Sequence, residues 1–144
     1  MMKTRAAVMA ALLAATVVAP TLQASPAFSA TSVHASILQG TVCGAGSTKR
    51  GNAAVTRNGT HVRVAVNGAL PAGDGFQISL YRVTSTLVCE QIGSASSTFA
   101  SNSAGYFQAA ATFHVPTRIA KFAVDLFDTT AHFDNATQFM KVAP

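Results

Sequence analysis

A two-residue alternation of apolar and polar side chains runs through most of this chain and limits the folds that it can adopt. Between residues 60 and 67, Val62, Val64 and Val66 fall on one phase and Arg63 falls on the other. Successive side chains of a β-strand point to opposite faces of a sheet, so this pattern predicts strands that are buried on one face. Gly, Pro and Asn interrupt the alternation about every 8–12 residues, which is typical of short antiparallel strands.

One hairpin is predicted in detail. Asn58 and Gly59 separate two alternating runs, and an Asn-Gly pair in this position is typical of a two-residue turn, since both residues accept positive φ. Such a turn places Val55 opposite Val62. Both side chains then lie on the same buried face, which supports this register.

The same reasoning predicts an all-β fold with about seven to nine short strands. Residues 31–144 are expected to form a single antiparallel β-sandwich, with a small closed barrel as the alternative architecture. We expect residues 128–135 to be a polar loop. The expected strands are residues 33–42, 53–57, 60–67, 76–83, 86–92, 98–101, 106–115, 119–127 and 137–142.

Two segments carry a resemblance to a known family. Residues 62–77 read Val-Arg-Val-Ala-Val-Asn-Gly-Ala-Leu-Pro-Ala-Gly-Asp-Gly-Phe-Gln, and residues 101–105 read Ser-Asn-Ser-Ala-Gly before an Ala- and Thr-rich strand. The chain resembles secreted bacterial immunoglobulin-like domains here, and among them the enediyne-chromophore apoproteins of the neocarzinostatin type. The resemblance implies an immunoglobulin-like sandwich. That family typically has two disulfides and this chain has two cysteines, so no residue of the family's ligand cleft is carried over.

The first thirty residues are predicted to be a secretory signal peptide. Lys3 and Arg5 precede an apolar run over residues 6–19, and Pro20 and several small residues follow. The alternative is an uncleaved membrane anchor, but the run is shorter than the roughly 20 apolar residues of a spanning helix. We therefore expect a secreted, extracellular protein that begins between residues 25 and 31 and has no membrane span in its mature form.

Both cysteines follow the predicted signal peptide. In an exported protein, a single pair of cysteines indicates one disulfide, so we predict a bond between Cys43 and Cys89. A metal pair or a reactive thiol is the alternative, although two isolated cysteines without His at ligand spacing make a poor zinc site.

The low charge restricts the possible functions. The chain has 144 residues, of which 49% are hydrophobic and 10% are charged, and without residues 1–30 eight basic residues face five acidic ones. This small excess argues against a nucleic-acid partner, which needs several phosphates neutralised. No Gly-x-Ser-x-Gly or phosphate-binding motif occurs.

We expect a non-catalytic binding or structural module with no cofactor and an unknown extracellular ligand or protein as its partner. The alternatives are a small-molecule carrier of the enediyne-apoprotein kind and a small secreted hydrolase.

One stretch near the C-terminal end combines ionisable and aromatic side chains. Carboxylates and an imidazole on one loop could hold Ca²⁺ or a transition metal, but Asp also favours turns, so we predict ordinary loop polarity and no metal. Aromatic residues at one end of a sandwich could form a recognition surface, or they could plug the core. The candidate recognition residues are Asp125, Phe127, Asp128, His132, Phe133 and Asp134.

Overall fold

The computed structural model describes residues 31–144 except residues 85 and 87, and its regular elements are all β-strands. The predicted signal peptide, residues 1–30, lies outside the described residues. In the described part, no helix is long and apolar enough to cross a membrane. The strands are β1 (Thr31–Gln39), β2 (Lys49–Asn58), β3 (His61–Ala69), β4 (Gly75–Val83), β5 (Cys89–Gln91), β6 (Phe99–Ala100), β7 (Tyr106–His114), β8 (Lys121–Asp128), β9 (Phe133–Thr137) and β10 (Met140–Lys141).

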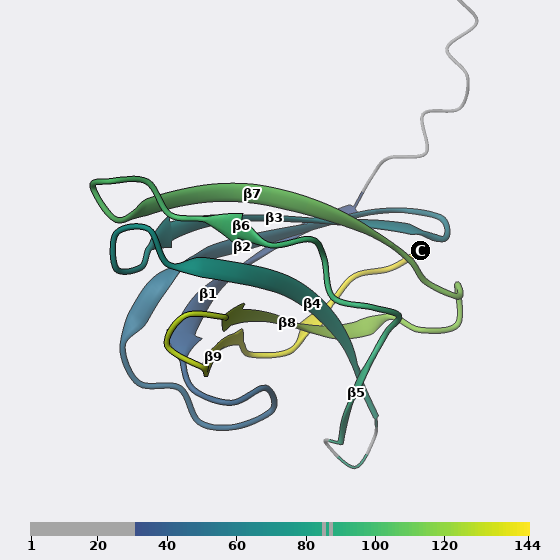
Figure 1. Cartoon of the computed structure of the whole chain (residues 1–144). Helices are drawn as coiled ribbons and strands as arrows, with labels where there is room; N and C mark the ends of the chain where they lie inside the picture. The colour runs from purple at the N-terminus through teal and green to yellow at the C-terminus, as the bar shows by residue number, and fades with distance from the viewer. Residues whose placement is uncertain (1–30, 85, 87) are drawn as a thin grey trace, which may run out of the picture.

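The strands form one strongly curled sheet, in the order β5-β4-β8-β9-β1-β2-β3-β7 (Figure 1). β10 pairs with β8, and β6 pairs with β4. All pairings between these strands are antiparallel, so the prediction of an all-β antiparallel fold is confirmed. β1 joins the two halves of the sheet, because residues 31–38 pair with β2 and residues 37–39 pair with β9.

The curl turns the inward faces of the two halves toward each other and encloses the core. The inward positions of β2 and β3 match the predicted phase, because Val55, Val62, Val64 and Val66 are all buried. The Phe76 ring from β4 lies 4.9 Å from the Phe107 ring from β7, measured between centroids. Fully buried apolar side chains include Ile37, Val55, Val62, Val64, Phe76, Ile78, Leu80, Val115, Phe122, Val124, Leu126 and Val142.

The predicted register of the first hairpin is wrong by two residues. Val55 pairs with Val64, and Asn58 pairs with His61, so the turn residues are Gly59 and Thr60. Gly59 has φ of 58°, whereas Asn58 stays extended within β2. A positive φ at only the first central residue is typical of type II′ turns, which prefer Gly there. A shift of two residues preserves the face of every side chain, so the buried set was still predicted correctly.

The prediction that residues 128–135 form a loop is also wrong. The turn spans only residues 129–132, and Phe133–Thr137 forms β9, which pairs with both β8 and β1. The first strand ends at Gln39 rather than at residue 42, and a loop over residues 40–48 follows. This loop runs beneath β9 in the view of Figure 1.

The predicted disulfide between Cys43 and Cys89 is confirmed. It links the 40–48 loop to β5, across 46 residues of sequence and a Cα–Cα distance of 6.1 Å. The loop is also held at its start, where the Gly40 N–H donates to the Asp134 carbonyl at 3.1 Å. The disulfide and this hydrogen bond together fix the 40–48 loop against the β4-β8-β9 half of the sheet.

Replacing Cys43 and Cys89 together by Ser is expected to lower the free energy of unfolding by about 4 kcal/mol, because the unfolded chain regains the entropy of an open loop. Urea unfolding of the oxidised protein and of the double variant measures this difference. The native protein under reducing conditions serves as the control and should match the variant. A difference below about 1 kcal/mol would contradict this role of the bond.

Arg57 is the largest fully buried side chain, at 1% exposed, and it lies on the inward face of β2. Its Nε donates to the Gly59 carbonyl at 2.8 Å, and its Nη2 donates to the Pro116 carbonyl at 3.0 Å. Its Nη1 donates to the carbonyls of Ile119 and Val142. Burial lowers the pKa of the guanidinium from its ordinary value. The group closes one end of the curled sheet with backbone carbonyls as its hydrogen-bond partners, and we call this the Arg57 end.

We expect Arg57→Met to lower the free energy of unfolding by about 3 kcal/mol or more, because it leaves several buried carbonyls without a donor. Arg57→Lys should cost less, since its ammonium keeps the charge but reaches fewer of these oxygens. Equilibrium denaturation measures both. Arg63→Met on the neighbouring strand is the matched control, because Arg63 faces solvent and its loss should change stability by about 0.5 kcal/mol at most. Equal effects of the two Met variants would overturn this role.

Candidate functional site

The predicted recognition residues lie on the hairpin that β8 and β9 form. Phe127 pairs with Asp134, and Asp128 pairs with Phe133. His132 lies in the turn between the strands with φ of 58°, and its N–H donates to the Asp128 carbonyl at 2.9 Å. The stretch is therefore contiguous in space, as the sequence suggested.

The hairpin nevertheless divides these side chains between its two faces. Asp125, Phe127 and Asp134 lie on the outward face, whereas Asp128 and Phe133 lie on the inward side with Leu126. In the described residues, no three Asp, Glu, His or Cys side chains come together at metal-binding distance. Phe127 is half-buried, and its ring lies 6.4 Å from the His132 ring. The six residues do not form one common surface.

Asp128 shapes the turn. Its side chain is fully buried, and Oδ1 accepts hydrogen bonds from the Thr130 N–H at 2.9 Å and the Ala131 N–H at 2.7 Å. These bonds satisfy two backbone donors that the tight turn leaves outside the sheet. The turn-forming interpretation is thus confirmed for this oxygen.

Asp125 is a buried acid on the outward face of β8, with only 4% of its surface exposed. Burial and the nearby Asp134 carboxylate raise its pKa from 3.8 to about 7, against the opposing effect of backbone N–H groups of Asn135 and Leu126. The pKa of Tyr81 is raised as well, through burial and the charges of Asp125 and Asp134. These three groups form one cluster on the face that the 40–48 loop passes.

Stability should therefore fall as the pH rises. Between pH 4 and 7 native Asp125 keeps a proton that the unfolded chain has released, so each step upward in pH favours unfolding, and above pH 7 this contribution is flat. The expected loss is on the order of 2–4 kcal/mol.

Urea unfolding of native protein and of Asp125→Asn at pH 4.5 and pH 8 measures this contribution. The variant carries a neutral amide in the same place, so its free energy of unfolding should change less between the two pH values. Glu90→Gln is the control, because Glu90 is exposed and should leave the pH dependence as it is. If the free energy of unfolding falls equally between the two pH values in the native protein and in Asp125→Asn, then Asp125 is not the source of the pH dependence.

A second candidate site lies on the outward face of β1, β2, β3 and β7, and no prediction singled it out. The strand register aligns equivalent side chains in rows that cross the sheet. The alanine row consists of Ala54, Ala65 and Ala110, and His34 continues it on β1. On one side lies the amide row, which consists of Asn52, Asn67 and Gln108. On the other side lie Thr56, Arg63 and Thr112.

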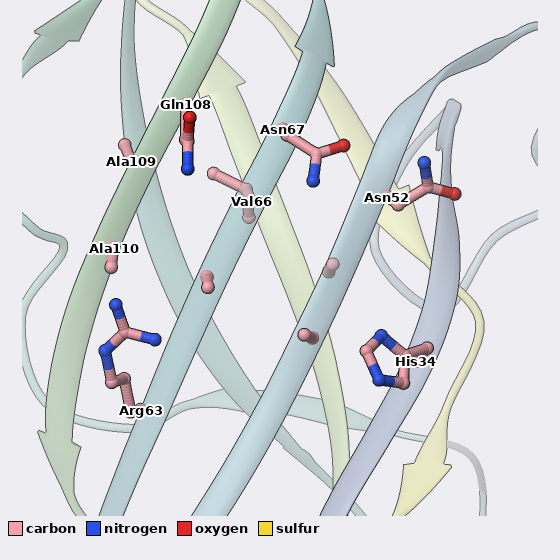
Figure 2. A pocket seen from close by; sticks show the side chains of 11 residues that line it. His34, Asn52, Arg63, Val66, Asn67, Gln108, Ala109 and Ala110 are labelled. Carbon is pink, nitrogen blue, oxygen red and sulfur yellow. The ribbon is translucent and has the colours of Figure 1, made fainter.

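These rows form a shallow groove with a volume of about 350 Å³ (Figure 2). The alanine methyl groups form its floor, because they are shorter than the side chains on either side. Figure 2 shows Asn52, Asn67 and Gln108 on neighbouring strands, with Arg63 and His34 at opposite flanks. We call this the alanine groove. A second depression of about 480 Å³ shares Asn67 with it and is lined by Lys49, Arg50, Gly51, Gly68, Ala69, Tyr106 and Phe107.

The charge of this face is one-sided. The four strands contain no Asp or Glu, whereas they carry Lys49, Arg50 and the exposed Arg63. Two further imidazoles lie at the far edge of the face, where the His61 and His114 rings meet edge to face at 5.8 Å between centroids. Tyr106 is 64% exposed at the other edge. The face therefore offers amides, an exposed aromatic ring and positive charge without a competing carboxylate.

The sequence contained one signal for this groove. Arg63 falls on the polar phase of its strand, opposite to Val62, Val64 and Val66. The alanines at the same phase of three strands, Ala54, Ala65 and Ala110, mark a strip that is too short and apolar for ordinary solvation. Recognising that strip requires the register between strands, which sequence alternation does not provide.

Comparisons of the chain with protein-family models, with curated proteins and with solved structures found no match.

Proposed function

We propose that this chain is a small exported binding protein without catalytic activity, and that its alanine groove binds an extended, acidic polysaccharide. The observation that carries this proposal is the alignment of three rows across β1, β2, β3 and β7. A row of methyl groups between a row of amides and an arginine offers an apolar strip with polar groups on both sides.

The chemistry of the rows matches that of sugars. Amide side chains both donate and accept hydrogen bonds, as sugar hydroxyls do. The guanidinium of Arg63 presents paired donors that fit a carboxylate or a sulfate. The absence of Asp and Glu from the four strands removes the repulsion that an acidic chain would otherwise meet.

The dimensions favour a chain over a small molecule. Arg63 and Ala69 are six residues apart on β3, which corresponds to about 20 Å along the strand. The alanine groove and the depression beside Tyr106 share Asn67, so they lie next to each other along the strands, with basic groups near both ends. The proposed ligand is therefore a polymer that lies along the strands.

Two features support the exported location and the architecture. The bond between Cys43 and Cys89 is consistent with an oxidising compartment, and residues 1–30 have the pattern of a signal peptide. The facing of β2 and β3 against β4 and β8 across one core supports the proposal of an immunoglobulin-like sandwich. The carrier alternative needs a solvent-open cleft lined by Phe, whereas the residues that line the alanine groove include no Phe.

Affinity gel electrophoresis with polygalacturonate, alginate, hyaluronan and heparin tests the proposal, with dextran as the neutral control. At least one acidic polymer should retard the native protein, and dextran should not. Retardation by none of the acidic polymers would overturn the proposal.

Variants then test the location. Ala65→Leu fills the floor of the groove and should abolish retardation, whereas Ala100→Leu, at an exposed position of β6, should leave it unchanged. Arg63→Ala should weaken binding about tenfold through loss of a charge-assisted pair. Arg118→Ala removes an exposed charge elsewhere and is its control. If both members of each pair behave alike, binding does not occur in the groove.

A further inference from the structure

Three turns meet at the end of the curled sheet opposite the Arg57 end. They are residues 70–75, 101–105 and 128–132. The Ser101 N–H donates to the Asp74 carbonyl at 3.0 Å, and the Ser101 hydroxyl donates to the Pro71 carbonyl at 2.6 Å. The Thr129 N–H donates to the Gly75 carbonyl at 2.8 Å. These bonds hold the three turns together as one structure, which we call the Asp128 end.

A buried carboxylate at this end has an oxygen without a partner. Asp128 is 0% exposed. Its Oδ1 accepts hydrogen bonds from two backbone N–H groups of the turn, whereas its Oδ2 has no hydrogen-bond partner among the described residues. Asn135 is equally buried, and its side-chain oxygen also has no partner there. The two residues lie on the same face of the β8–β9 hairpin, two pairing steps apart, since the Phe127–Asp134 pair separates the Asp128–Phe133 pair from the Leu126–Asn135 pair.

A second carboxyl group faces the first. Asp74 lies close to Asp128, because Phe76 pairs with Asp128 in the sheet and the Gly75 carbonyl accepts a hydrogen bond from the Thr129 N–H. Within the described residues, the ion pair between Arg82 and Glu90 is the only one, so no basic side chain pairs with Asp74 or Asp128. A buried carboxylate without a cationic partner is costly, and a second carboxylate increases that cost.

We propose that Asp74, Asp128 and Asn135 bind a calcium ion at the Asp128 end. Two carboxylates and one amide carbonyl are the oxygen ligands that Ca²⁺ prefers, and water would supply the remaining positions. The set contains no imidazole or thiolate, which argues against Zn²⁺. Magnesium demands a stricter octahedral geometry, which three ligands from two connected turns and a strand do not easily provide. This site differs from the predicted one, because it uses neither His132 nor Asp134, and it contradicts our prediction that no metal binds.

Three protein ligands give a weak site. Extracellular calcium modules with few ligands have dissociation constants of about 10⁻⁴–10⁻³ M, and we expect this range here. Bound calcium would join the 70–75 turn to the β8–β9 hairpin, so its main effect is on stability. The proposal does not depend on polysaccharide binding, because the alanine groove lies on the outward face of other strands.

Thermal unfolding of the full, disulfide-bonded chain tests the proposal after dialysis against a chelator. At pH 7.5, 10 mM CaCl₂ should raise Tm by about 5 °C, and a NaCl solution of equal ionic strength should not. MgCl₂ should have a smaller effect than CaCl₂. Calorimetric titration with CaCl₂ should give one ion per chain. No shift and no heat up to 10 mM would overturn the proposal, and would indicate that Asp74 and Asp128 share a proton instead.

Isosteric variants locate the ion. Asp128→Asn keeps an oxygen that can accept from the turn but removes the charge, so the variant should fold and lose the calcium shift. Asp74→Asn should do the same. Asp134→Asn is the matched control, since Asp134 belongs to the same hairpin but faces outward, and it should keep the full shift. A shift that survives in Asp74→Asn and Asp128→Asn, or an equal shift with NaCl, would contradict the proposed site.

Discussion

The curled sheet depends on one buried cation at the Arg57 end. The Arg57 side chain takes an inward position of β2 that an apolar residue would ordinarily occupy, and it reaches carbonyls of three separate segments. These are the turn after β2, the connection between β7 and β8, and the segment after β10. Arginine stays protonated in proteins, so its charge must be stabilised where it lies. Carbonyl dipoles stabilise it only when all three segments are in place, which links closure of the fold to a single side chain.

The Asp128 end contains a buried carboxylate instead of a buried cation, and its hydrogen bonds are less complete than those of Arg57. Arg57 finds an acceptor for each of its three nitrogens, and its guanidinium also lies 5.5 Å from the centre of the Phe122 ring. Asp128 uses one oxygen on the turn and leaves the other without a partner among the described residues. A chain with only five acidic residues places two of them, Asp74 and Asp128, against each other. Burial makes such an arrangement costly for the protein alone, which is the physical reason to look for a bound cation there.

Alternation predicted the buried side chains well, because the face on which a strand residue lies depends only on whether its position in the strand is odd or even. Val55 and Val64 share the buried face whether the turn begins at Asn58 or at Gly59, so a wrong register left the predicted core unchanged. Arg57 is two residues after Val55, so alternation also places it on the buried face. The sequence therefore indicated a buried arginine, but a charged side chain is ordinarily expected to face solvent. β9 was missed because its residues, Phe-Asp-Asn-Ala-Thr, have turn composition, and its polar inward positions are buried only through pairing with β1 and β8.

The alanine groove was beyond sequence reasoning for a related reason. Each contributing residue is an ordinary outward side chain on its own strand, and only the pairing of β1, β2, β3 and β7 aligns them into rows. The same pairing makes the groove rigid, because β2 and β3 are hydrogen-bonded on both sides and alanine has no side-chain rotamers to order. Little conformational entropy is then lost on binding, so a shallow site with few contacts can still hold a ligand. Its selectivity would come from the amide row and from Arg63, whose exposed guanidinium can donate to a carboxylate or a sulfate.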